Sequence, residues 1–254
     1  MSRAATLLFA LFAYAVFFAT FLYLICFVGN VPFAPLTVDR GPEAPVAIAV
    51  LINVALIASF GLQHSVMARQ EFKQRWTQIV PPPAERSVYV LVASLMLIVL
   101  FLLWRPIEGM VWDARGTALE LPLWLAFAAG WGIVLLSTFL LNHFELFGLQ
   151  QAWFHMRGRQ AEPQKLRQPL FYKWVAHPLY SGFFLAFWAT PYMSYGHLLL
   201  ALGMSAYMLI AIRYEERDLV GHYGDEYVRY RSGVGKLAPR LRRGGSSPPP
   251  GTAA

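Results

Sequence analysis

Two short polar segments flank apolar runs near the C-terminal end of this sequence. HPLY, from His177 to Tyr180, opens one apolar run, and RYEE, from Arg213 to Glu216, ends the next. Proline fits the first turn of a helix because it lacks an N–H that would go unpaired there. The free N–H groups that follow can hold an anion, while carboxylates accept hydrogen bonds from hydroxyl and amino groups. Together the two segments predict a binding site for a polar cofactor.

The elements that must position this site are membrane helices. The chain has 254 residues, of which 57% are hydrophobic and only 14% charged, whereas soluble domains carry about 25% charged residues. Four apolar runs approach the roughly 20 residues that cross a bilayer. Two more are separated by the interruption Thr190–His197 and predict a helical hairpin with a short first arm. The six runs are Ala4–Gly29, Val46–Met67, Ser87–Trp104, Leu121–Leu141, Leu179–Pro191 and His197–Ile212.

We therefore predict an all-α integral membrane protein with five to six transmembrane helical segments, the last two forming a hairpin. Residues 1–141 should form a four-helix transmembrane core, and residues 142–238 the hairpin region that binds the cofactor. Residues 239–254 combine Arg with Gly, Ser and Pro, which is typical of a disordered basic tail. The first run is longer than a signal-peptide core of about 7–15 residues, so it is assigned as a membrane helix.

The distribution of basic residues predicts the orientation. Successive connections between the helices should alternate between the two sides of the membrane. Of the 21 Lys and Arg residues, only Arg40, Arg105 and Arg115 lie in the connections on one side. The others lie at the two ends of the chain or in the segments 69–86 and 157–173. The positive-inside rule predicts that the basic segments 69–86 and 157–173, both termini and the cofactor site lie in the cytoplasm. The net charge of +7 is thus a topology signal, and no base-reading basic face suggests nucleic-acid binding.

A hairpin brings its own start and end to one membrane face. His177, Tyr180, Arg213, Glu215 and Glu216 should therefore converge, with the aromatic segment GHYGDEYVRY folding over them as a lid. Neither GxGxxG nor GxxxxGK[ST] occurs, so a nucleotide-like cofactor would be held by helix ends and loops. No metal is expected, because the six histidines are widely spaced, HExxH is absent and the chain has one Cys. His64 and His143 stand at helix ends, where interfacial histidines are common.

These segments also carry a family resemblance. YKWVAHPLYSG (Tyr172–Gly182) and YEERDLVGHYGDEYVRYRSGV (Tyr214–Val234) resemble the C-terminal signature of the isoprenylcysteine carboxyl methyltransferase superfamily. Its members are membrane enzymes that bind S-adenosylmethionine without a Rossmann domain. One departure is Ala176, where the family usually has Arg. By matching position, the resemblance implies that the cofactor is bound by Tyr172, His177, Pro178, Tyr180, Glu215, Glu216 and, less firmly, Tyr227.

The rest of the chain resembles one branch of this superfamily. LQHSVMAR (62–69), ERSVYVL (85–91), NHFELFGLQQ (142–151) and AFWATPYMSYGHLLLA (186–201) are similar to bacterial enzymes that convert methanethiol to dimethyl sulfide, a branch beside the NnrU-like proteins. This implies a thiol S-methyltransferase in the bacterial inner membrane. Two alternatives stay open: methylation of a larger acceptor, an isoprenylcysteine carboxylate or phospholipid amine, and a non-enzymatic NnrU-like role.

Methyl transfer to a thiol needs some thiolate. A thiol with a pKa near 8.5 is a few per cent ionised at pH 7, so a modest base would help. The candidates are His143, Glu145, Tyr195 and His197, and Arg213 could instead favour the thiolate by its charge. Tyr195 and His197 lie at the hairpin tip and reach the site only if a short first arm buries that tip in mid-membrane.

Overall fold

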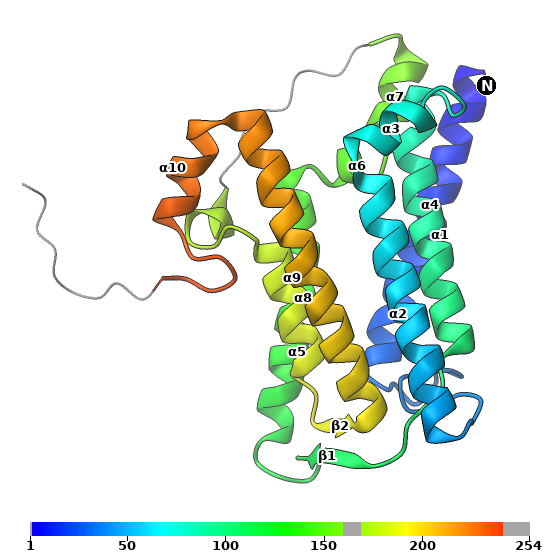
Figure 1. Cartoon of the computed structure of the whole chain (residues 1–254), viewed down its shortest axis with the longest axis vertical. Helices are drawn as coiled ribbons and strands as arrows, with labels where there is room; N and C mark the ends of the chain where they lie inside the picture. The colour runs from blue at the N-terminus through cyan, green and yellow to red at the C-terminus, as the bar shows by residue number, and fades with distance from the viewer. Residues whose placement is uncertain (1, 160–168, 241–254) are drawn as a thin grey trace, which may run out of the picture.

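The fold is a helical membrane bundle. The computed structural model describes residues 2–159 and 169–240; most of the predicted tail, residues 241–254, lies outside them. Within these ranges five helices are long and apolar enough to cross a membrane, which confirms the predicted fold class (Figure 1). They are α1 (Arg3–Val28), α2 (Val46–Ala68), α4 (Pro82–Leu103), α5 (Glu120–Leu141) and α9 (Tyr195–Tyr223).

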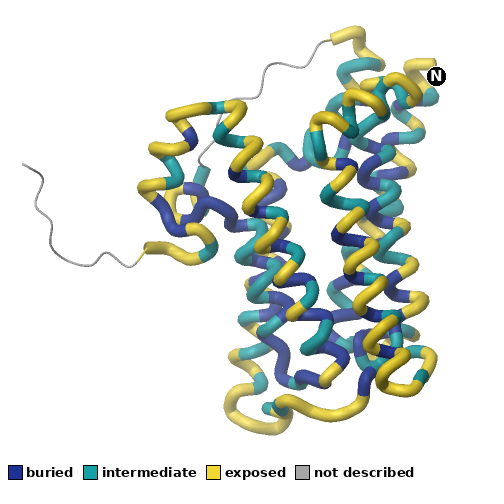
Figure 2. The backbone as a smooth tube through the Cα atoms, viewed as in Figure 1, coloured by how far each residue is buried: buried dark blue, intermediate teal, exposed yellow. Residues whose placement is uncertain are grey.

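The surface of the bundle is apolar. Leu8, Leu51 and Leu121 are 67%, 70% and 66% exposed, as are many other large apolar residues of the spanning helices. Exposed positions recur along these helices in Figure 2. In water this surface would be strongly unfavourable, whereas in a bilayer it faces lipid tails. The protein is therefore an integral membrane protein.

The helices form two groups that meet where α2 packs on α9. One group contains α1, α2 and α4, and the other contains α5, α9 and the short helix α8 (Pro178–Trp188). A continuous core that includes Phe27, Trp104, Phe187 and Leu200 joins the two groups. The backbones of α5 and α8 approach each other closely at Gly130 and Gly182. A Cβ atom added at Gly130 would lie 2.8 Å from the carbonyl oxygen of Gly182, and a Cβ atom added at Gly182 would lie 2.7 Å from the carbonyl oxygen of Gly130. Small residues at such crossings are typical of membrane helices.

The hairpin tip lies at the end of the bundle opposite to the charged end of α9. Its strand β2 (Tyr192–Ser194) pairs antiparallel with β1 (Met110–Asp113), which connects α4 to α5. The expected short first arm is present as α8. The extended segment 189–194 follows it and contains β2, which lies alongside β1.

The remaining helices gather at the other end of the bundle, with the N-terminus (Figure 1). They are α3 (Gln70–Trp76), α6 (His143–Leu146), α7 (Leu149–Arg157) and α10 (Asp225–Gly233), and the 3₁₀ turn η1 (Leu170–Lys173) precedes α8. The ribbon thus separates Arg3, α3, α7 and α10 from the connections that contain Arg40, Arg105 and Arg115. The charge asymmetry of the sequence corresponds to the two ends of the bundle.

Candidate active site

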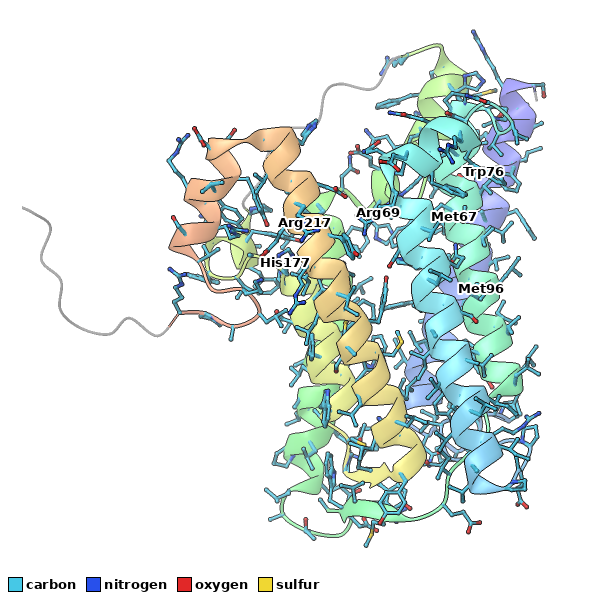
Figure 3. All side chains as sticks on the ribbon, viewed as in Figure 1. Met67, Arg69, Trp76, Met96, His177 and Arg217 are labelled. Atoms are coloured by element: carbon cyan, nitrogen blue, oxygen red, sulfur yellow. The ribbon has the colours of Figure 1, made fainter. Side chains whose placement is uncertain are left out.

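The start of α8 and the end of α9 lie together, as the hairpin prediction requires. The His177 Nε2 atom is 3.3 Å from Glu216 Oε1, and its Nδ1 atom is 3.9 Å from Glu215 Oε1. The Tyr180 hydroxyl donates a 2.8 Å hydrogen bond to Glu215 Oε2. His177 is buried, and Pro178 occupies the first turn of α8. In Figure 3, His177 lies beside α9, whereas Arg69 lies across from α9 at the end of α2.

Glu216 is the most heavily bonded carboxylate of this cluster. Besides His177, it accepts hydrogen bonds at Oε2 from Arg231 Nη1 at 3.3 Å and Lys236 Nζ at 3.2 Å. Its side chain is only 9% exposed, and a buried carboxylate requires such partners to stay ionised. Both of its oxygens are thus occupied by groups from three separate segments. Glu215 is 44% exposed and has more room to bind a ligand.

The chain after α10 is held against the segment before α8. Val175 and Gly235 form a parallel bridge, and the N–H of Ala176 donates to the Gly235 carbonyl at 2.7 Å. The Tyr230 hydroxyl donates to the Tyr172 carbonyl at 2.8 Å. Ala176, which departs from the superfamily pattern, therefore contributes a backbone contact. The aromatic C-terminal segment packs on the site as expected.

An open pocket borders this cluster. It has a volume of about 380 Å³ and is lined by Arg213, Glu216, Arg217, Val220 and Arg231. The Tyr227 side chain is nearly inaccessible, and its hydroxyl has no hydrogen-bond partner among the described residues. Burial, with the charge of Glu216 next, raises the pKa of Tyr227, so its hydroxyl is a protonated donor. A buried hydroxyl without a partner is uncommon in folded proteins and fits a site that a polar ligand completes.

The phenol of Tyr172 is also buried close to the carboxylates. Its side chain is buried, and burial followed by the charge of Glu215 raises its pKa. Tyr172, His177, Tyr180, Glu215, Glu216 and Tyr227 therefore form one neighbourhood at the junction of η1, α8, α9 and α10. Arg213 joins them through the pocket lining, as the hairpin argument requires.

The other candidate bases lie elsewhere. His197 is buried at the tip end, where its Nε2 atom is 3.0 Å from the Phe187 carbonyl oxygen. Tyr195 is 51% exposed beside it. At 1.5 Å per residue, His197 and Glu215 are separated by about 27 Å along α9. The structure does not bring Tyr195 or His197 to the cluster around His177, because β1 pairs with β2 at the tip.

His143 and Glu145 occupy the α5–α6–α7 corner. Both ring nitrogens of His143 are engaged, with the Tyr14 hydroxyl at 2.8 Å from Nε2 and Thr138 Oγ1 at 2.8 Å from Nδ1. Its ring stacks on Phe139 with the centroids 4.2 Å apart. Glu145 Oε2 accepts a 2.9 Å hydrogen bond from Asn142. These contacts stabilise the corner, and within residues 2–159 and 169–240 no group of three His, Cys, Asp or Glu side chains forms a metal site.

Sequence reasoning missed two groups of this site. Arg231 and Lys236 were assigned only to the general basic content of the C-terminal segment, and both bind Glu216. Their spacing after the two carboxylates, within RSGVGK, was the available signal. His64 was assigned to an interface, yet its Nδ1 atom is buried and has no hydrogen-bond partner among the described residues.

Comparison with known proteins now decides the family. The chain is 47% identical to the methanethiol S-methyltransferase of Mycobacterium tuberculosis (strain ATCC 25618 / H37Rv) over 239 residues, covering 94% of this chain and 98% of that protein. It is 49% identical to methanethiol S-methyltransferase 1 of Bradyrhizobium diazoefficiens, covering 92% of this chain and 82% of that one. The chain belongs to the methanethiol S-methyltransferase family. The predicted membership is confirmed.

A more distant similarity extends beyond bacteria. Nurim of Pan troglodytes is 28% identical over 190 residues, which cover 71% of this chain and 70% of nurim. No protein-family model matches the chain, and no solved structure matches it. Membership of a methyltransferase family implies a methyl donor.

Proposed function

We propose that this protein methylates methanethiol to dimethyl sulfide, with S-adenosylmethionine as the methyl donor. The single observation that carries the proposal is the near full-length similarity, at 44–49% identity, to six proteins named methanethiol S-methyltransferase. When bound, S-adenosylmethionine supplies an electrophilic methyl group on a sulfonium centre. The protein's task is to hold the donor, bring the thiol to it and exclude water.

The donor site we propose is the pocket bordering Glu216 together with the groups around it. Arg213, Arg217 and Arg231 suit the carboxylate of an amino acid. Glu215 suits an ammonium or ribose hydroxyl, and the unpartnered Tyr227 hydroxyl supplies one more hydrogen bond. Tyr172, His177, Pro178 and Tyr180 form the adjoining wall. The volume of about 380 Å³ lies within the 300–1,000 Å³ usual for small-molecule sites.

A low-dielectric setting suits this reaction. A sulfonium and a thiolate lose their opposite charges as the methyl group passes between them, so removing water favours the reaction. Holding the two sulfur atoms and the methyl carbon in line supplies the orientation. We propose that residues 142–238 form the unit that binds the methyl donor, on the membrane core of residues 1–141.

The activity test uses detergent-purified full-length protein, S-adenosylmethionine and methanethiol, with headspace dimethyl sulfide measured by gas chromatography. We expect product with the unaltered protein and at least a tenfold lower rate for His177→Ala and Glu215→Ala. Glu226→Ala, an exposed carboxylate on α10, is the matched control and should keep the rate. Calorimetric binding of S-adenosylhomocysteine should weaken in the first two variants alone. Absence of both product and binding would refute the proposal.

We also propose that the protein resides in the bacterial inner membrane with both termini and the donor site in the cytoplasm. The natural chain contains one cysteine, Cys26, so Cys26→Ser gives a background for site-specific labelling. In that background, Arg115→Cys should react with an impermeant maleimide from outside spheroplasts, whereas Ser232→Cys should react only in inverted vesicles. The opposite pattern would reverse the orientation.

A further inference from the structure

His64 occupies the inner face of α2. The buried residues Asn53, Ile57, Phe60 and Gly61 precede it with the three- and four-residue spacing of one helix face. Gly61 leaves room for Tyr207 of α9, because a Cβ at Gly61 would lie 2.8 Å from Tyr207 Cδ2. This close approach directs His64 toward α4 and α9, into the protein.

Aromatic rings surround the imidazole of His64. Its centroid lies 5.4 Å from that of Phe60, 5.0 Å from that of Tyr89 on α4 and 6.2 Å from that of Tyr207. The Nδ1 atom is buried and has no hydrogen-bond partner in the described part of the chain. A polar atom held in an aromatic enclosure without a partner is costly, so a ligand that supplies a proton would satisfy it.

Two tyrosines connect this enclosure to the donor site. Tyr207, which contacts His64, and Tyr180 of the donor site pack against the same hydrophobic core. Tyr180 is in turn bonded to Glu215 and packs edge-on to His177 with ring centroids 5.8 Å apart. His64 thus contacts, through Tyr207, the same core that supports Tyr180 of the proposed donor site.

We propose that the thiol binds between Tyr180 and His64, and that His64 Nδ1 accepts the S–H hydrogen bond and takes the proton. This inference rests on the proposed function. The rings of Phe60, Tyr89 and Tyr207 offer sulfur–aromatic contacts, which suit a one-carbon thiol.

The step balances in atoms and charge. The S–H bond breaks and its proton passes to Nδ1, while the sulfur electron pair forms the new S–C bond. The bond from the methyl carbon to the sulfonium breaks, and its electrons stay on the leaving sulfur. The positive charge therefore moves from the sulfonium to the imidazolium. Tyr89 and Tyr207 face His64 as neutral phenols. Arg86 of α4 is the charged group that acts on His64; its positive charge favours a thiolate nearby and works against the imidazolium.

The test compares His64→Gln and His64→Ala with His222→Gln, an exposed histidine on α9. Because general-base catalysis contributes about 10²–10⁴-fold, we expect both His64 variants to lose at least a hundredfold in kcat. S-adenosylhomocysteine binding should stay within twofold. In unaltered protein saturated with S-adenosylhomocysteine, methanethiol should raise the Tm further, and this second rise should be lost in His64→Ala.

Two further readouts separate proton transfer from a structural role. Added imidazole should restore His64→Ala activity at least tenfold. The rate of His64→Gln should rise tenfold per pH unit below the thiol pKa, because only preformed thiolate then reacts. Normal activity in His64→Gln, or parallel loss of S-adenosylhomocysteine binding without imidazole rescue, would overturn the inference. Absence of dimethyl sulfide from the unaltered protein would instead refute the proposed function.

Discussion

Glu216 should hold the C-terminal segment against the start of α8, and Glu216→Gln tests this. The glutamine keeps the volume and one acceptor but removes the charge that His177, Arg231 and Lys236 share. A hydrogen bond to a charged group contributes about 1.5–3 kcal/mol when buried, which applies to the His177 contact. Arg231 and Lys236 are 41% and 51% exposed, so their contributions are reduced by solvent to well under 1 kcal/mol each.

The expected loss is therefore about 2 kcal/mol of local stability, or roughly a 30-fold increase in the detached population at 1.4 kcal/mol per tenfold. Limited trypsin digestion measures it. Cleavage after Lys236 requires detachment, because the Lys236 carbonyl accepts a 3.1 Å hydrogen bond from the His177 N–H. When opening and closing are fast, the cleavage rate follows the open population.

The control is Asp218→Asn on the same helix. Asp218 is 59% exposed and makes one 3.6 Å ion pair, with Arg69, so its loss should change the cleavage rate by about twofold or less. If the two variants are cleaved after Lys236 equally fast, the contacts of Glu216 do not hold the segment and the reasoning fails.

Three further perturbations test other parts of the bundle. Gly130→Ala should lower the free energy of unfolding by about 1–3 kcal/mol, because the added Cβ meets the α8 backbone. The Cβ added in Gly132→Ala meets nothing within 4 Å, so this control should be neutral or stabilising. Equal Tm values of the two variants in detergent would contradict the close contact. Desolvation lowers the pKa of His143, so the stability from its neutral ring is present above its unfolded pKa of about 6.5 and is lost as the pH falls through the lower folded pKa. The Tm of the unaltered protein should therefore fall more steeply between pH 7 and 5 than that of His143→Gln, and parallel curves would exclude this origin. Arg69 lies 3.9 Å above the Tyr214 ring and pairs with Asp218; Arg69→Gln should lower stability by about 1 kcal/mol or less, with the difference shrinking in high salt, and a salt-independent loss would indicate a packing role instead.

The membrane helices and the hairpin were predictable because hydropathy and helix-terminal chemistry are local signals. The HPLY segment marked the start of α8 through Pro178. RYEE marked the end of the apolar part of α9, which continues as a charged helix to Tyr223. Their convergence followed from the hairpin alone. The contacts inside the site could not be predicted from the sequence. Glu216 and Lys236 belong to different elements, and they pair only because α10 turns back on α9.

The orientation of His64 was missed for a related reason. A histidine near the end of a hydrophobic run is read as interfacial, and the α2 sequence is apolar on every face, so its periodicity gives no inner side. The packing of Tyr207 against Gly61 defines that side. The tip strands are equally inaccessible to pattern analysis, since four and three residues are too few to carry an alternating signal.

The extended segment 189–194 lengthens the first arm of the hairpin, whose helix α8 is shorter than the five long helices. At 1.5 Å per residue, α8 accounts for about 16 Å of a hydrocarbon core of about 30 Å, and segment 189–194 completes the first arm. Extended backbone at that depth must have its polar groups satisfied within the protein. The Thr190 carbonyl accepts from Trp112 Nε1 at 2.9 Å, the Pro191 carbonyl accepts from Ala114 at 2.7 Å, and β1 pairs with the rest. With this extended segment, the first arm is long enough for His177, just before α8, to reach Glu216 on α9.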